Sequence, residues 1–353
     1  MSQGRLFADL AELSAAFGPP GHEEDVAEIF RRRLDGFAAC RRDRLGSIVA
    51  ELPGPGPRVM LAAHLDEVGF MVRAVTADGF LRFLPLGAWW SQVLPATPVR
   101  IRGRSGEVRG VIGSKPPHFL RAEERQKPLP IEEMFIDVGA SSSAAAAALG
   151  LGPGAVAVPD AAPAALAGGV VMGKALDDRV GVLAAIEVVK RLAAEGHPNT
   201  LFAVGTVQEE IGGRGARTAA QMLHPDVCLV LEGAPADDVA GATREYIQGG
   251  LGRGPQIRIF DPSMIGNRRL VELACEEAEA RGFSPQLAVR EAGATDGGQI
   301  HLVDLGVPAL VIGIPVRYAH GPFGLCALDD VEKAIELVAG LVRRLDAPTV
   351  AAL

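Results

Sequence analysis

One stretch of this sequence, an apolar run that leads into two adjacent acids and two glycines, constrains the fold more than any other. The run 200–207 is followed by Glu209 and Glu210, and then by Gly212 and Gly213. A continuous apolar run is typical of a strand buried on both faces, and function in α/β sheets gathers at the carboxyl edge. Adjacent carboxylates are costly to hold together unless a cation or a proton intervenes. The stretch therefore predicts either a solvated pair at a strand end or part of a site.

Four further apolar runs end at, or shortly before, a histidine or an acid. Between them lie helical patterns, for example at 180–192 and 329–345. Together these patterns predict an α/β fold, with a mixed sheet flanked by helices and its strand ends at a common edge. The side chains at these ends are His64, with Asp66 two residues later on the same side of an extended chain, Asp177, Glu232 and His320.

The region from 72 to 166 has a different texture. Short alternating runs such as 99–102 and 107–112 are separated by glycines and prolines, which predicts a small β-rich domain. Because strand and site signals lie on both sides of this region, we interpret it as an insertion. The predicted catalytic domain is then discontinuous, with residues 1–71 and 167–353 on either side of an inserted domain at 72–166.

Charge and cysteine usage narrow the class of protein. The formal net charge of −8 argues against nucleic acid or an anionic membrane as partner, because both require a basic face. The four cysteines are widely spaced, and the sequence shows neither a secretory leader nor an apolar stretch suited to crossing a membrane. These features predict a cytoplasmic protein with reduced thiols.

The residues at the strand ends suit a hydrolytic metal centre. Two imidazoles and three carboxylates are what two zinc-like ions about 3.5–4 Å apart require when one carboxylate bridges them. Glu209 is then left over and is a natural general base for an activated water. The alternative is that these residues are structural, since Asp177 could simply cap the following helix and a lone strand histidine is usually a satisfied polar residue. The candidate ligands are His64, Asp177, Glu210, Glu232 and His320.

Five ordered segments resemble the signature segments of the tetrahedral dinuclear aminopeptidases, family 42 of the M-class metallopeptidases. The resemblance extends over about residues 5–346. The segments are His64–Phe70, Lys174–Arg179, Val207–Glu210, Gly293–Asp296 and Arg317–His320.

This resemblance implies that Asp177 bridges two divalent ions, with zinc expected first and cobalt or manganese as alternatives. His64 and Glu232 would complete one metal site, and Glu210 with His320 the other. By the same resemblance Glu209 is the general base and Asp66 supports the site. The implied fold is a zinc-peptidase α/β domain that carries an inserted, barrel-like dimerisation domain. The implied substrates are peptides with a free N-terminus, and the implied assembly is a dodecamer built from dimers.

Two departures from the family pattern leave the substrate open. Many members have Asp where Glu232 stands, and the segment after His320 reads Gly321-Pro322-Phe323-Gly324 instead of Ser-Pro-Val-Glu. An aminopeptidase is the predicted function. The alternatives are a metal-dependent hydrolase of another amide or of a glycan, and a catalytically weakened metal-binding homologue.

Overall fold

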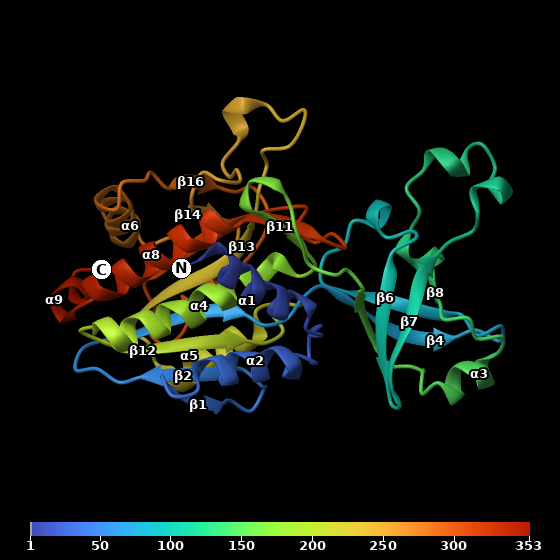
Figure 1. The fold of residues 1–353 in the computed structure, drawn as a ribbon, viewed down its shortest axis with the longest axis horizontal. Helices are drawn as coiled ribbons and strands as arrows, with labels where there is room; N and C mark the ends of the chain where they lie inside the picture. Colours follow the sequence, from blue (N-terminus) through green and yellow to red (C-terminus); the bar gives the residue numbers. More distant parts are fainter. Residues whose placement is uncertain (1) are drawn as a thin grey trace.

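The computed structural model describes residues 2–353 and has two parts. A large mixed sheet packed between helices forms one part, and a smaller closed barrel projects from one side of it (Figure 1). The fold class predicted from the sequence, a helix-flanked mixed sheet with a small barrel, is confirmed.

The large sheet draws its strands from nearly the whole chain outside the barrel. They are β1 (Ala39–Arg42), β2 (Ile48–Leu52), β3 (Arg58–His64), β10 (Ala164–Ala165), β11 (Val170–Gly173), β12 (Thr200–Thr206), β13 (Val227–Pro235), β14 (Gln256–Asp261), β15 (Met264–Ile265), β16 (Gln286–Val289), β17 (Ala309–Arg317) and β18 (Gly324–Ala327).

The strand order brings distant segments together. The main path is β1-β2-β12-β3-β13-β17-β18-β11-β10, and β14 joins β17 from the side together with β15 and β16. β12, β3, β13 and β17 are mutually parallel neighbours along this path. Because these four strands run in one direction, their carboxyl ends lie at the same edge of the sheet.

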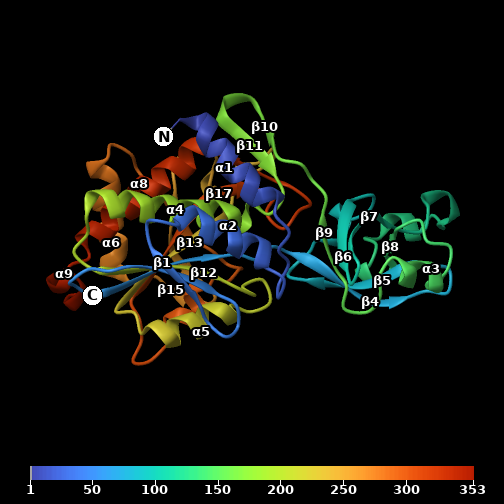
Figure 2. The same ribbon diagram turned by 60° about the horizontal axis from the view of Figure 1, so that its bottom comes forward.

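Helices cover both faces of the large sheet. α1, α2, α4, α6 and α8 pack on one face and α5 and α7 on the other, as the tilted view makes clear for α4 and α5 (Figure 2). The helices are α1 (Gln3–Ala15), α2 (Glu24–Leu34), α4 (Leu176–Glu195), α5 (Arg214–Leu223), α6 (Arg268–Ala280), α7 (Gly297–Ile300), α8 (Leu328–Arg344) and α9 (Ala347–Ala351).

The alternation of side chains along β3 explains why its sequence is apolar throughout. Val59 and Leu61 pack into the core under α4, whereas Met60 and Ala62 pack into the core under α5. Side chains of a strand point alternately to opposite faces, so a strand covered on both faces needs apolar residues at every position.

The barrel has a core of its own, formed by side chains such as Phe70, Ile101 and Ile136. Its strands close in the order β4-β5-β8-β7-β6-β9, and α3 (Ser143–Ala148) lies against it. They are β4 (Gly69–Val75), β5 (Leu81–Leu86), β6 (Pro98–Gly103), β7 (Gly106–Gly113), β8 (Phe135–Asp137) and β9 (Val156–Pro159).

α1 is a helix that the sequence patterns above do not include, although Leu6, Leu10 and Leu13 follow a helical spacing and are buried.

Across residues 2–353, none of the helices combines the length and apolarity that a membrane crossing requires.

Candidate metal centre

The predicted site residues gather at the carboxyl edge of the large sheet. His64 is the last residue of β3, Glu209 and Glu210 follow β12, Glu232 lies near the end of β13, and His320 follows β17. Asp177 reaches the same place from the start of α4. Because β3, β12, β13 and β17 are parallel, residues up to 256 positions apart in the sequence become neighbours here.

Two groups of potential ligands share one carboxylate. His64, Asp177 and Glu232 form the first group, and Asp177, Glu210 and His320 form the second. In the first, His64 Nε2 lies 3.1 Å from Asp177 Oδ1 and 3.7 Å from Glu232 Oε1. In the second, His320 Nε2 lies 3.4 Å from Asp177 Oδ2 and 3.4 Å from Glu210 Oε2. Asp177 therefore offers one oxygen to each group.

The second nitrogen of each imidazole is already engaged. His64 Nδ1 lies 3.2 Å from the carbonyl oxygen of Asp66, and His320 Nδ1 lies 2.8 Å from that of Ala88. A carbonyl only accepts, so each Nδ1 donates its hydrogen and Nε2 is the ring atom that faces the acids; when Nε2 gives up its proton, the ring keeps Nδ1–H and presents the lone pair of Nε2. This is the tautomer and orientation in which histidine binds a metal ion.

The protonation equilibria show how strongly these groups perturb one another. Burial raises the pKa of Glu210 to about 8, although the charge of His320 opposes the rise. Burial would lower the pKa of His320, but its hydrogen bond with Asp177 and the charge of Glu210 raise that pKa to about 9. Burial opposes the charged form of Asp177 as well, yet hydrogen bonds from His320 and His64 hold its pKa well below the usual range.

Three buried acids of this region each have one side-chain oxygen without a hydrogen-bond partner among residues 2–353. Burial raises the pKa of Glu232 and raises that of Asp296 to about 7. Glu210 Oε1, Glu232 Oε2 and Asp296 Oδ1 are buried without a hydrogen-bond partner in the part of the chain that the structure describes. Buried polar atoms are normally satisfied, so orphaned carboxylate oxygens around two imidazoles fit divalent cations well. The donor set therefore suits divalent metal ions.

Glu209 lines the cavity that opens onto this cluster. The cavity has a volume of about 880 Å³ and also contacts Asp177, Glu210, Glu232 and His320. Burial raises the pKa of the Glu209 carboxyl well above its usual range, and the charge of Glu232 acts in the same direction. A carboxyl beside the cavity that belongs to neither ligand group remains available for proton transfer.

Asp66 holds the chain that carries the two glutamates. Its side chain is fully buried, and its two oxygens accept hydrogen bonds of 2.9 Å from Glu209 N and 3.0 Å from Glu210 N. Asp66 thus acts on the backbone beside the cluster and is a member of neither group of potential ligands.

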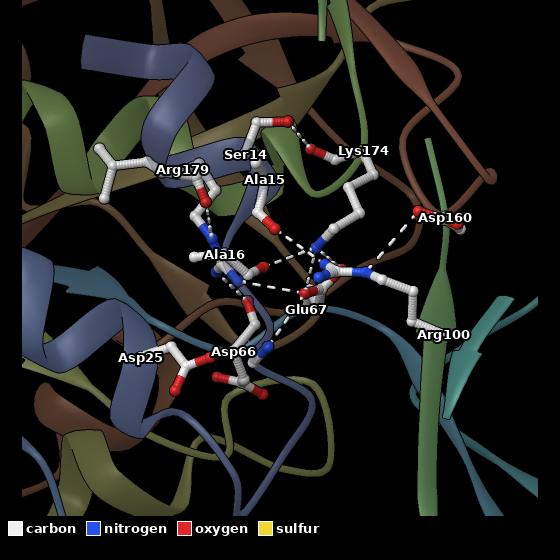
Figure 3. A network of polar contacts seen from close by, with 12 residues as sticks. Ser14, Ala15, Ala16, Asp25, Asp66, Glu67, Arg100, Asp160, Lys174 and Arg179 are labelled. Carbon is white, nitrogen blue, oxygen red and sulfur yellow. Dashed lines mark hydrogen bonds and ion pairs between the residues drawn. The ribbon is translucent and has the colours of Figure 1, made fainter. Parts of the chain in front are cut away.

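A second group of buried charges, Glu67, Lys174 and Arg179, lies next to Asp66 (Figure 3). Lys174 Nζ donates to both carboxylate oxygens of Glu67, at 2.6 and 2.7 Å, and Arg179 Nη2 donates to Glu67 Oε1 at 3.3 Å. Arg179 also donates to the carbonyl oxygens of Leu13 and Asp66. Burial lowers the pKa of Lys174 to about 8, although the charge of Glu67 opposes this. These ion pairs fix the segment that follows β3.

Asp178 serves the local backbone. Its oxygens accept hydrogen bonds from Gly181 N at 3.0 Å and from His64 N at 3.1 Å. The other histidines lie outside both groups of potential ligands. Among them, His224 contacts Asp304, and His301 contacts the carbonyl oxygen of Gly297.

Sequence reasoning gave no role to three residues that the structure places at or beside the site. Asp296 is buried near the cluster and accepts a hydrogen bond from the hydroxyl of Thr206. Arg258 and Arg290 line the cavity. Asp296 does end one of the quoted segments, so its position in Gly293–Asp296 was an available signal, whereas nothing local distinguishes the two arginines from exposed ones.

Comparison with known proteins adds independent information. The family described as M42 glutamyl aminopeptidase matches residues 46–337. The glutamyl aminopeptidase of Lactococcus lactis subsp. cremoris (strain MG1363) is 33% identical over an alignment 353 positions long, which covers 98% of each chain.

Two solved structures are similar over almost the whole chain. A TET aminopeptidase from the marine sediment archaeon Thaumarchaeota archaeon SCGC AB-539-E09 has a TM-score of 0.96 and 40% identity, covering 100% of this chain and 99% of the other. PhTET1-12s, described as a dodecamer, has a TM-score of 0.86 and 30% identity, covering 96% of this chain and 99% of the other.

Proposed function

Since the chain belongs to the M42 glutamyl aminopeptidase family, and is thus a metal-dependent aminopeptidase, we propose that two divalent ions bridged by Asp177 form its active centre. His64 and Glu232 complete one site. Glu210 and His320 complete the other. The observation that carries this proposal is that the two oxygens of Asp177 face the Nε2 atoms of two imidazoles whose Nδ1 atoms are held by backbone carbonyls.

The protein supplies proton transfer and orientation around these ions. When bound, divalent ions of this kind activate water and polarise the carbonyl of the scissile bond. Glu209 takes a proton from the attacking water and delivers it to the leaving amine, a task that suits a carboxyl with a raised pKa. Asp66 keeps Glu209 in place through the backbone. The cavity receives the free N-terminus of a peptide, so that a single residue is released.

The finer assignments follow the same proposal. The ligand set of two imidazoles and three carboxylates suits zinc first, and cobalt or manganese next. We propose self-association into dimers and then into a dodecamer, supported by the PhTET1-12s structure, which is described as a dodecamer. The four cysteines are free thiols, which is consistent with the reducing cytoplasm.

The test is turnover of aminoacyl-p-nitroanilides and short peptides by protein stripped with a chelator and refilled separately with zinc, cobalt or manganese. We expect release of the first residue only after refilling, with two ions bound per chain. Release of sugar from a glycan, or cleavage of internal peptide bonds, would identify another hydrolase. Two bound ions without turnover on any substrate would indicate the weakened homologue.

A further inference from the structure

Glu23 is a buried carboxylate for which the proposed reaction has no role. It precedes α2, where an acid commonly caps the helix, but its side chain makes no capping hydrogen bond to α2. The side chain turns the other way, and Glu23 Oε1 accepts from Gly21 N at 2.7 Å and from Gln208 N at 3.0 Å. Only 5% of the residue is exposed. Gln208 is the residue immediately before Glu209.

Two buried carboxylates hold three successive amides of the turn after β12. Glu23 accepts from Gln208 N, and Asp66 accepts from Glu209 N and Glu210 N. Each peptide plane from Gln208 to Glu210 therefore has its N–H fixed by an acceptor that belongs to another part of the chain. The direction of the Glu209 side chain follows from the orientation of these planes.

The first of these residues adopts a conformation that needs outside support. Gln208 has a φ of 58°, in the left-handed region that residues other than glycine rarely adopt. Such conformations persist where the surrounding structure over-determines them. The hydrogen bond from Gln208 N to Glu23 supplies that constraint on the side of the turn that Asp66 does not reach.

The two carboxylates share a buried counter-charge. Arg179 is fully buried, and its positive charge acts on Glu67, Asp66 and Glu23. Figure 3 shows its guanidinium among the carbonyl groups next to Asp66. Burial and the charge of Asp66 raise the pKa of Glu23 to about 7. In either protonation state the side chain keeps an oxygen that can accept from the two amides.

We propose that Glu23 is a positioning residue for Glu209, because it fixes the backbone of Gln208 and so aims the Glu209 carboxylate into the cavity. The inference rests on the proposed role of Glu209 as general base. It assigns Glu23 to the reaction through the backbone, without contact with substrate or metal.

The experiment compares Glu23→Gln, Glu23→Asp and Glu23→Ala in the metal-loaded, full-length protein. Glutamine keeps the reach of the acceptor and removes the charge, whereas aspartate keeps the charge and withdraws the acceptor by one methylene. Since a shift of about 1 Å in a reacting group can cost ~100-fold, we expect kcat to fall about tenfold in Glu23→Asp and ~100-fold in Glu23→Ala. We expect Glu23→Gln to stay within about threefold of the wild type. KM and bound metal should change little, since neither depends on the Glu209 side chain.

The neighbouring variant Glu24→Ala is the matched control, because Glu24 is exposed in the same helical turn. If kcat per metal-loaded chain is unchanged in Glu23→Asp and only the melting temperature falls, Glu23 is merely structural and the inference is wrong. Higher activity in Glu23→Asp than in Glu23→Gln would also overturn it, since charge and not reach would then matter. If Glu23→Ala does not fold, the comparison of Glu23→Asp with Glu23→Gln still tests the inference. A wild type that releases no N-terminal residue with any metal refutes the proposed function itself, and is thereby distinguished from failure of the Glu23 inference.

Discussion

Two clusters of buried charge lie on either side of the short segment from His64 to Glu67, and they are balanced in opposite ways. The rear cluster consists of Glu67, Lys174 and Arg179, and in it Glu67 is paired with both cations at hydrogen-bonding distance. The front cluster consists of His64, Asp177, Glu210, Glu232 and His320, with Glu209 beside them. Its acids face each other and the two imidazoles, and Glu210 and Glu232 each have one oxygen without a hydrogen-bond partner among the described residues.

The difference separates structural charge from functional charge. A buried carboxylate that has a lysine and an arginine within reach is satisfied by the protein itself. A group of buried carboxylates with raised pKa values and orphaned oxygens is unfavourable unless something else brings positive charge to it. Equal burial therefore has two meanings here, and only the cluster whose carboxylates form no ion pair with a lysine or arginine among residues 2–353 is suited to bind metal ions.

The comparison predicts the largest effect for Glu209, an acid beside the front cluster to which we assign proton transfer and not metal binding. Glu209→Gln should lower kcat by about 10²–10⁴-fold, because a carboxamide cannot take the proton, while two ions per chain remain bound. The matched variant Glu210→Gln should instead lose metal. Turnover on an aminoacyl-p-nitroanilide and metal content by elemental analysis check both. Loss of metal from Glu209→Gln would place this residue among the ligands and contradict the division.

The rear cluster should respond in stability. Lys174→Met removes the cation that bonds both oxygens of Glu67 and leaves this buried carboxylate only the longer bond to Arg179, so we expect a loss of up to about 3–5 kcal/mol of unfolding free energy. The double variant Lys174→Met/Glu67→Leu removes both charges and should recover most of this loss. Urea denaturation of metal-loaded protein measures both. Equal losses in the single and double variants would mean that packing, and not charge balance, explains this cluster.

Removing the metal ions should destabilise the front cluster alone. Each occupied site adds about 2.7 kcal/mol when the free metal exceeds its Kd a hundredfold, so a chelator should lower the melting temperature of the wild type clearly. Glu210→Gln should show a smaller change on chelation. Calorimetric scans with and without a chelator provide the measurement. A wild-type melting temperature that does not respond to metal would refute the cation requirement.

Local sequence patterns predict most residues of the front cluster and few of the rear cluster. An apolar run that ends at, or shortly before, a histidine or an acid is a local signal, so the strand ends at His64, Glu210 and Glu232 could be predicted along with the mixed sheet. The pairing of Lys174 with Glu67 joins residues 107 positions apart, and each alone resembles an exposed charge. Their burial follows from the packing of α1 against α4, which no local pattern encodes.

The shared role of Asp177 has the same kind of limit. Its position before a helix also fits a simple cap, and only the meeting of α4 with the edge of the sheet brings its two oxygens to two histidines. The sequence indicates Asp177 as a candidate ligand, and the resemblance of the chain to a family implies that Asp177 bridges two ions. Only the folded chain shows that its two oxygens face two different histidines. The contact between Glu23 and Gln208, 185 positions apart, lies equally beyond local patterns.

Asp330 in α8 is an intermediate case and provides the smallest predicted effect. Its carboxylate is buried without a bonded cation, but it accepts hydrogen bonds from Gly252 N and Gly254 N. Burial raises its pKa from 3.8 to about 6, and the two amide bonds only partly oppose the rise. The folded chain therefore binds this proton more tightly than the unfolded chain does, so the contribution of Asp330 to stability is present below about pH 4 and is lost as the pH rises through about 6.

Asp330→Asn cannot ionise, so it should escape that loss, although its single carbonyl oxygen can accept from only one of the two amides and one hydrogen bond is lost at every pH. Relative to the wild type, the variant should gain on the order of 2 kcal/mol between pH 4 and pH 7, because a shift of one pKa unit corresponds to about 1.4 kcal/mol. Urea denaturation at a series of pH values gives the difference. A gain that is independent of pH would show that the amides satisfy the carboxylate fully. Buried acids would then need neither side-chain cations nor metal ions when backbone donors suffice, and the contrast between the front and rear clusters would lose its generality.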